Sequence, residues 1–170
     1  DSKVKHALVD SPYNKRRQSC ERVAATLGVE TLRDADMKML NAVRGDITAE
    51  DYFRAKFVIE EKDRVLAVCD ALVKGDFETV GEKMYETHHG LSKDYEVSCE
   101  ELDFLNDIAA RCGVTGSRIM GGGFGGCTIN LVKDELYDQF IATAKKEFND
   151  AYGHEPVVIP VVISDGARRI

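Results

Sequence analysis

Apolar residues recur three or four positions apart through most of the chain, which is the spacing of amphipathic helices. This pattern predicts six helices, placed by their apolar positions and their flanking residues. Their expected ranges are 12–27, 37–44, 49–74, 76–95, 99–112 and 134 to about 152. The third helix is the longest, and its expected inner side consists of Tyr52, Ala55, Val58, Leu66, Cys69 and Val73.

Small polar residues mark the starts of several predicted helices, because their side chains accept hydrogen bonds from the first backbone amides. Ser11 has the position of such a cap, and Pro12 follows it at the first helical position. Thr48 has the same position before the longest helix. Ser98 and Glu101 form the spacing of a capping box, which predicts that Ser98 caps the fifth helix.

The pattern changes to that of strands after residue 113. Segments 117–120 and 127–133 are rich in β-prone residues and flank a run of glycines, and the two ends of the chain, 3–9 and 155–170, also resemble strands. Helices come first and strands late, without strict alternation, so we predict an α+β fold. We expect a small, mostly antiparallel sheet with helices packed on one face, in a single domain that covers residues 1–170.

Charge and cysteine usage narrow the class of function. The 170 residues carry 23 basic and 30 acidic side chains, a net charge of -7, which argues against nucleic acid or an anionic membrane as partner. The five cysteines are odd in number and form no CxxC pair, so we expect reduced, mostly buried thiols in the cytoplasm rather than disulfides or a zinc site. No apolar run is long enough to span a membrane.

Five glycines and one phenylalanine fill positions 121–126. Gly121, Gly123 and Gly126 satisfy the pattern GxGxxG, but a strand follows them where a dinucleotide site needs a helix. A Walker loop is excluded because no Lys-Ser or Lys-Thr follows, and a protein kinase loop because HRD and DFG are absent. Three alternatives remain: amides that bind an anion, close packing on another backbone, or a tight turn without a ligand.

Four stretches, in this order, resemble the galactokinase family of the GHMP small-molecule kinases. They are SPYNKRRQSCERVA at 11–24, MYETHHGLSKDYEVSCEELD at 84–103, RIMGGGFGGCTI at 118–129 and SDGAR at 164–168. The third resembles the third signature motif of these kinases. Met120 departs from the family pattern, which usually has threonine before the glycines.

The resemblance implies a GHMP kinase C-terminal domain with a ferredoxin-like fold, taken from a longer enzyme that phosphorylates the anomeric hydroxyl of galactose. ATP and Mg would be bound mainly by an N-terminal portion outside this chain, which would also hold the catalytic base. The isolated chain is then expected to be inactive and to self-associate through the surface that packs on that portion. Kinases for N-acetylgalactosamine or arabinose, and an inactive sugar sensor, remain as alternatives.

Residue by residue, the resemblance implies that Tyr13 contacts the sugar and that the third-motif loop lies beside sugar and nucleotide phosphate. The loop residues are Gly121, Gly122, Gly123, Phe124, Gly125 and Gly126. Arg16 and Arg17 match a basic run for which salt bridges are at least as good an explanation as phosphate contacts. His88 falls on an apolar helical stripe and Cys127 lacks an activating partner, so we expect neither to be catalytic.

Overall fold

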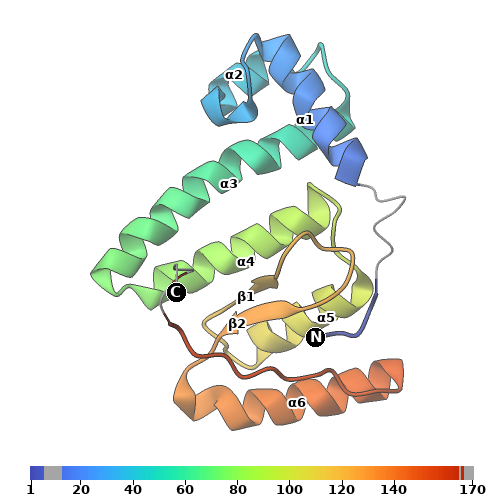
Figure 1. Ribbon diagram of the computed structural model, residues 1–170, viewed down its shortest axis with the longest axis vertical. Helices are drawn as coiled ribbons and strands as arrows, with labels where there is room; N and C mark the ends of the chain where they lie inside the picture. Colours follow the sequence, from blue (N-terminus) through green and yellow to red (C-terminus); the bar gives the residue numbers. More distant parts are fainter. Residues whose placement is uncertain (6–12, 165, 167–170) are drawn as a thin grey trace.

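The computed structural model describes residues 1–5, 13–164 and 166, and this part of the chain is mainly helical (Figure 1). Ser11, Pro12 and most of the expected first strand therefore lie outside the described residues. The elements are α1 (Tyr13–Leu27), the 3-10 helix η2 (Leu32–Asp34), α2 (Met37–Ala42), α3 (Ala49–Lys74), α4 (Phe77–Lys93), α5 (Glu100–Arg111), β1 (Gly116–Ile119), β2 (Thr128–Leu131) and α6 (Asp134–Tyr152).

Local hydrogen bonds explain where most helices begin. The Thr48 side chain accepts from the amide of Asp51 at 3.1 Å, which confirms it as the cap of α3. The predicted cap of α5 is wrong, because Cys99 occupies the cap position. The Ser98 hydroxyl instead donates to the carboxylate of Asp103 at 2.5 Å, so a side chain deeper in α5 captures it.

Two hydrophobic clusters lie toward opposite ends of the molecule (Figure 1). The first joins α1, η2 and α2 to the N-terminal half of α3 and contains Val23, Ala24, Leu32, Ala35, Leu40, Tyr52, Ala55 and Ile59. The second joins α5 and α6 and contains Ile108, Ala109, Val114, Phe140 and Ala144. Helix α4 and the hairpin of β1 and β2 lie between these two regions in Figure 1.

The hairpin is held against α4 by a glycine-to-glycine contact. β1 and β2 pair antiparallel, with Gly116 opposite Leu131 and Ile119 opposite Thr128. A β-carbon added to Gly81 of α4 would lie 1.9 Å from the carbonyl oxygen of Thr115, and one added to Gly116 would lie 2.5 Å from the α-carbon of Gly81. These backbones approach closely because neither glycine has a side chain.

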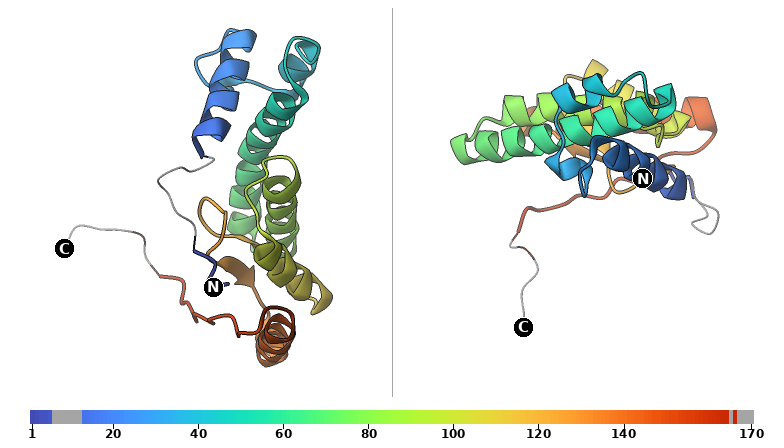
Figure 2. Two further views of the ribbon diagram at one scale, coloured as in Figure 1. Left: turned by 90° about the vertical axis from the view of Figure 1, so that its right-hand side faces the viewer. Right: turned by 90° about the horizontal axis from the view of Figure 1, so that it is seen from above.

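The sheet is smaller than predicted, with two strands in the described part of the chain, and the ferredoxin-like arrangement is not confirmed. The first residues join the end of the glycine loop by few backbone bonds: the amide of Ser2 donates to the carbonyl of Gly126 at 2.8 Å, and that of Gly126 to Val4 at 3.1 Å. The amide of Val157 donates to Asp1 at 2.9 Å. Residues 157–164 form no strand and lead away from the helices (Figure 2). Their β-branched sequence predicts extended backbone, but a strand also needs a neighbour.

The expected inner side of α3 is correct only for its first half. Tyr52 and Ala55 are buried, whereas the side chains of Leu66 and Val73 are 62% and 90% exposed and Cys69 is exposed as well. The other four cysteines are half-buried, so the expectation of mostly buried thiols is also wrong. The second half of α3 packs on α4 along one side, as the hydrogen bond from Thr87 to Glu61 shows, and no described element covers the apolar residues on its other side.

Candidate functional site

The glycine loop, residues 121–126, connects β1 to β2 and rises toward the start of α1 (Figure 1). Its backbone lies in the left-handed region at Gly121, Gly123 and Gly126, with φ of 81°, 84° and 83°. Phe124 also has a positive φ, 62°, which is uncommon for a residue with a side chain. Glycine is therefore required here by conformation as well as by space.

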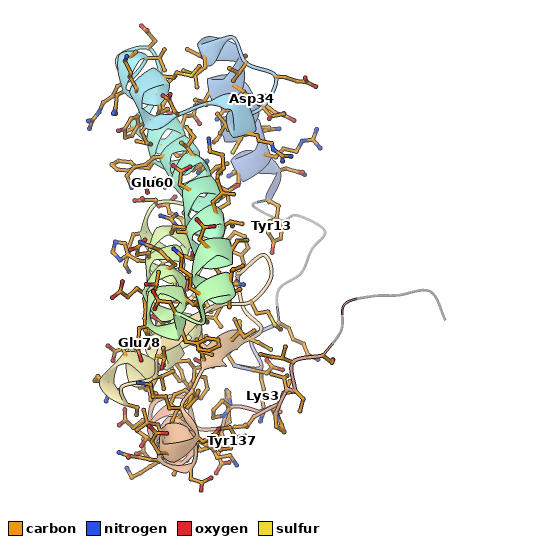
Figure 3. All side chains as sticks on the ribbon, turned by 90° about the vertical axis from the view of Figure 1, so that its left-hand side faces the viewer. Lys3, Tyr13, Asp34, Glu60, Glu78 and Tyr137 are labelled. Carbon is orange, nitrogen blue, oxygen red and sulfur yellow. The ribbon has the colours of Figure 1, made fainter. Side chains whose placement is uncertain are left out.

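Tyr13 lies against this loop from the first turn of α1 (Figure 3). Its hydroxyl donates to the carbonyl oxygen of Gly123 at 3.5 Å, a long hydrogen bond. A β-carbon at Gly122 would lie 2.3 Å from the same hydroxyl. The rings of Tyr13 and Phe124 meet edge to face, with centroids 5.2 Å apart. The structure thus brings together the tyrosine and the loop that the sequence places 110 positions apart.

The loop packs on the backbones of two other segments. A β-carbon at Gly123 would lie 2.1 Å from the carbonyl oxygen of Val97, and one at Gly125 would lie 2.5 Å from that of Val4. The same carbonyls accept hydrogen bonds from the amides of Phe124 at 2.6 Å and of Gly126 at 3.1 Å. Of the alternatives for the glycines, close packing on another backbone is therefore observed.

Arg16 is buried beside the loop, one turn after Tyr13. Its guanidinium donates to the carbonyl oxygens of Tyr95 and Glu96 at 2.9 and 2.5 Å, and lies over the ring of Phe124 at 5.6 Å. Burial and the neighbouring Arg54 lower the pKa of Arg16, partly opposed by the carboxylate of Glu96. The sequence held one signal for this burial. Arg16 lies four residues before Cys20, on the helical face where the apolar residues Cys20, Val23, Ala24 and Leu27 recur.

His88 and the acidic residues Asp94 and Asp103 make contacts within the fold. Nε2 of His88 lies 3.1 Å from the carboxylate of Asp103, which also accepts hydrogen bonds from Ser92 and Ser98. Burial lowers the pKa of His88 despite this carboxylate. Asp94 pairs with Lys56 at 2.7 Å. The carboxylates of Asp94 and Asp103 thus have structural partners within the fold.

The described residues contain no group of three or more His, Cys, Asp or Glu side chains arranged to hold a metal ion. None of the helices in the described ranges is long and apolar enough to cross a bilayer. Charged and polar side chains also line an open groove of about 760 Å³ between α3 and α4, but neither Tyr13 nor the glycine loop borders it. The arrangement around Tyr13 offers a phenol and a closely packed loop, features suited to orienting a small polar molecule.

The model of the family "GHMP kinases C terminal" matches residues 69–150, a range that includes the glycine loop. A galactokinase of Thermotoga petrophila is 39% identical over 171 aligned residues, which cover 100% of this chain and 48% of that protein. The chain belongs to the GHMP kinases. A human galactokinase is 40% identical over 99% of this chain and 42% of its own length, so this GHMP kinase chain spans about half the length of the curated relatives it matches.

Among solved structures, the galactokinase of Lactococcus lactis complexed with galactose resembles this GHMP kinase chain with a TM-score of 0.82 and 28% identity. That match covers 91% of this chain and 42% of the other. The likeness supports a common fold in which the hairpin and its glycine loop are positioned by α4 and α5. Tyr13 lies outside the range of the family model, but the matches to whole relatives include its position.

Proposed function

We propose that this chain is the C-terminal part of a galactokinase, in which the full-length protein transfers the γ-phosphoryl group of ATP to the anomeric hydroxyl of galactose. In such a transfer, positioning and charge stabilisation do most of the catalytic work. The role of this chain is to form one wall of the site. Identity of about 39% to galactokinases along the whole chain supports this assignment.

One observation carries the proposal. The hydroxyl of Tyr13 lies next to Gly122 and Gly123, so the two elements assigned to the sugar by resemblance meet at one place. They come from distant parts of the sequence, 110 positions apart. The solved galactokinase with a similar fold was crystallised with galactose.

The chemistry expected of this wall is recognition. The phenol of Tyr13 can donate one hydrogen bond to a sugar hydroxyl, and its ring offers an apolar edge to the pyranose. Because Gly122 has no β-carbon, the phenol can pack directly against the backbone of the loop. Gly121, Gly122, Gly123, Phe124, Gly125 and Gly126 then fix where the sugar lies rather than transfer a proton.

ATP is the phosphoryl donor in this proposal, with Mg²⁺ as its counterion. The metal does not fit the described residues, which lack a cluster of three or more ligands. We therefore assign no step of the reaction to a metal held by this chain, and expect the 170-residue chain alone to be inactive. Galactose-dependent consumption of ATP by the isolated chain would contradict this expectation.

The test uses the full-length protein that carries this sequence. We expect it to consume ATP with galactose, and more slowly with N-acetylgalactosamine or arabinose. Tyr13→Phe should raise the KM for galactose about tenfold through loss of one hydrogen bond in a buried site, and Gly122→Ala should raise it further by steric contact with Tyr13. Tyr137→Phe on α6 is the matched control and should change nothing, because that side chain is exposed.

Three outcomes would decide against the proposal. Preference for another sugar would indicate a related kinase. Galactose binding without ATP consumption would indicate a sensor. An unchanged KM in Tyr13→Phe would remove Tyr13 from the sugar site even if the protein is a galactokinase.

We also propose that the full-length protein is cytoplasmic. A further proposal is that the isolated chain self-associates. Exposed apolar side chains on α3 and on residues 157–163 support this, since large exposed apolar areas mark contact surfaces. Pairing of these last residues with residues 1–4 and the hairpin would also complete a ferredoxin-like sheet. Sedimentation velocity of the 170-residue chain that gives only monomer would contradict the self-association.

A further inference from the structure

The connection between α4 and α5, residues 94–99, supports the glycine loop. The carbonyl oxygen of Val97 accepts the amide of Phe124, and it lies where a β-carbon of Gly123 would be. Val97 is itself buried, and its amide donates to the carbonyl of Leu91 at the end of α4. The place of the loop therefore depends on the place of this connection.

The connection has an unusual backbone that a side chain from α1 holds. Glu96 has a φ of 53°, a conformation that costs about 1 kcal/mol for a residue other than glycine. The carbonyls of Tyr95 and Glu96 both accept from the guanidinium of Arg16. Hydrogen bonds from a charged donor are stronger than neutral ones, so Arg16 can offset the cost of this backbone.

Arg16 also meets the loop directly. Tyr13 and Arg16 are three residues apart and so share one face of α1. The ring of Phe124 packs edge-on against the Tyr13 ring and lies under the Arg16 guanidinium. Phe124 is the one loop residue with a side chain, and it adopts a positive φ that glycine would adopt without strain. A side chain kept at such a position indicates that its ring contacts matter.

We propose that Arg16 is a positioning residue for sugar binding: it holds the 94–99 connection and the Phe124 ring, and thereby keeps the glycine loop in place against Tyr13. This inference rests on the proposed function for its kinetic effect. It does not require Arg16 to touch substrate. Loss of Arg16 should therefore loosen the loop and weaken galactose binding, with little change in the KM for ATP.

The experiment compares Arg16→Gln, Arg16→Lys and Arg17→Gln in the full-length protein. Arg17 is the matched control, because it is the same residue type and next in sequence, but it is exposed, and among the described residues its ion pair is with Glu21 on its own helix. Hydrogen exchange of the peptide containing 120–127 reports on the loop whether or not the protein is a kinase. Kinetics then give the KM values for galactose and ATP.

We expect Arg16→Gln to speed exchange in 120–127 at least about tenfold and to raise the KM for galactose about tenfold, since two buried carbonyls lose a charged donor. Arg16→Lys keeps the charge but not the two-pronged geometry, so it should restore part of both effects. Arg17→Gln should match the unaltered protein. Exchange in 120–127 that is as slow in Arg16→Gln as in Arg17→Gln would overturn the proposal, whatever the kinetics.

A second variant keeps the proposal testable if Arg16→Gln does not fold. Phe124→Leu leaves Arg16 and its two carbonyls intact but removes the ring contacts. It should give faster exchange in 120–127 with a smaller rise in the KM for galactose. No change in Phe124→Leu would show that the ring does not hold the loop. If the unaltered protein phosphorylates no sugar, the proposed function fails, while the exchange data still decide the role of Arg16.

Discussion

The two halves of α3 have the same amphipathic pattern but opposite surroundings. In residues 49–60, Tyr52, Ala55 and Ile59 belong to a buried cluster. In residues 61–74, Val65, Leu66, Leu72 and Val73 are all more than half exposed. The first half is enclosed by α1, η2 and α2, whereas the second has α4 along one side (Figure 1). The comparison teaches that a hydrophobic pattern selects a face, while burial depends on whether another element covers it.

The largest loss of stability is expected from a substitution in the buried first half of α3. Ile59→Ala removes a fully buried side chain and leaves a cavity, so it should lower the free energy of unfolding by about 3 kcal/mol. Leu66→Ala in the exposed half should change it by less than about 0.5 kcal/mol. Urea unfolding of both variants in the same protein measures the difference. Equal losses would mean that something covers the second half in solution.

An ion pair in the first half of α3 allows a second comparison between the two halves of this helix. The buried carboxylate of Asp51 accepts two hydrogen bonds from Arg22, at 3.0 and 2.6 Å. Asp51→Asn should cost about 1 kcal/mol, a value reduced because the Arg22 side chain is half exposed. Asp63→Asn, at an exposed position in the second half, is the control and should be neutral in thermal unfolding. A neutral Asp51→Asn would show that the pair contributes nothing.

The free energy of unfolding should depend on pH in two separate ranges, one set by Asp51 and one by His88. The hydrogen bond from Arg22 lowers the pKa of Asp51, so its contribution is present above the ordinary aspartate pKa and is lost as the pH falls through the lower folded value. Burial lowers the pKa of His88 on α4, so the unfolded chain takes up a proton first and stability falls once the pH drops below about 6.5. Among the described residues Nδ1 of His88 has no acceptor for that proton.

The measurement is the unfolding free energy between pH 7 and 5. We expect it to fall with a slope of less than about 1.4 kcal/mol per pH unit from this single group. His88→Gln should flatten the fall, whereas His89→Gln, at the exposed neighbouring position, should not. Identical slopes in these two variants would exclude His88 as the source.

Substitutions of the exposed apolar residues in the second half of α3 should have the smallest effect on stability. Leu66→Gln with Val73→Gln should leave the unfolding free energy within about 0.5 kcal/mol, because both side chains are already in water. The same change should weaken self-association of the 170-residue chain, measured by sedimentation velocity. Self-association that is unaffected by these substitutions would direct attention to residues 157–163 instead.

Local signals in the sequence were enough for most of the helices. The range 49–74 is confirmed, and so is the helix from 134 to about 152, because apolar periodicity and a turn-forming glycine such as Gly75 act within one or two turns. The exposure of Leu66 and Val73 and the lack of a strand at 157–163 could not be predicted in this way. Both depend on a neighbouring element, which periodicity does not report.

In the candidate site, too, local features could be predicted from the sequence, whereas contacts with distant segments could not. The glycine run left close packing on another backbone as one of three alternatives, and the resemblance to a family singled out Tyr13. The partners of the loop were missed, because they are the carbonyl oxygens of Val97 and Val4, which every residue type possesses. Arg16 could have been separated from Arg17 by its place on the apolar stripe of α1, but the two carbonyls it binds carry no sequence signature.

The glycine-to-glycine contact between α4 and β1 matters for anyone who wishes to make this protein more heat-resistant. Replacing a glycine inside a helix by alanine is a standard route to that end, since it reduces the freedom of the unfolded chain. At Gly81 the added methyl group would meet the carbonyl oxygen of Thr115 and push the hairpin, with its loop, away from the helix. A consensus or propensity-based redesign that treats Gly81 as an imperfection would therefore displace the wall of the site it was meant to preserve.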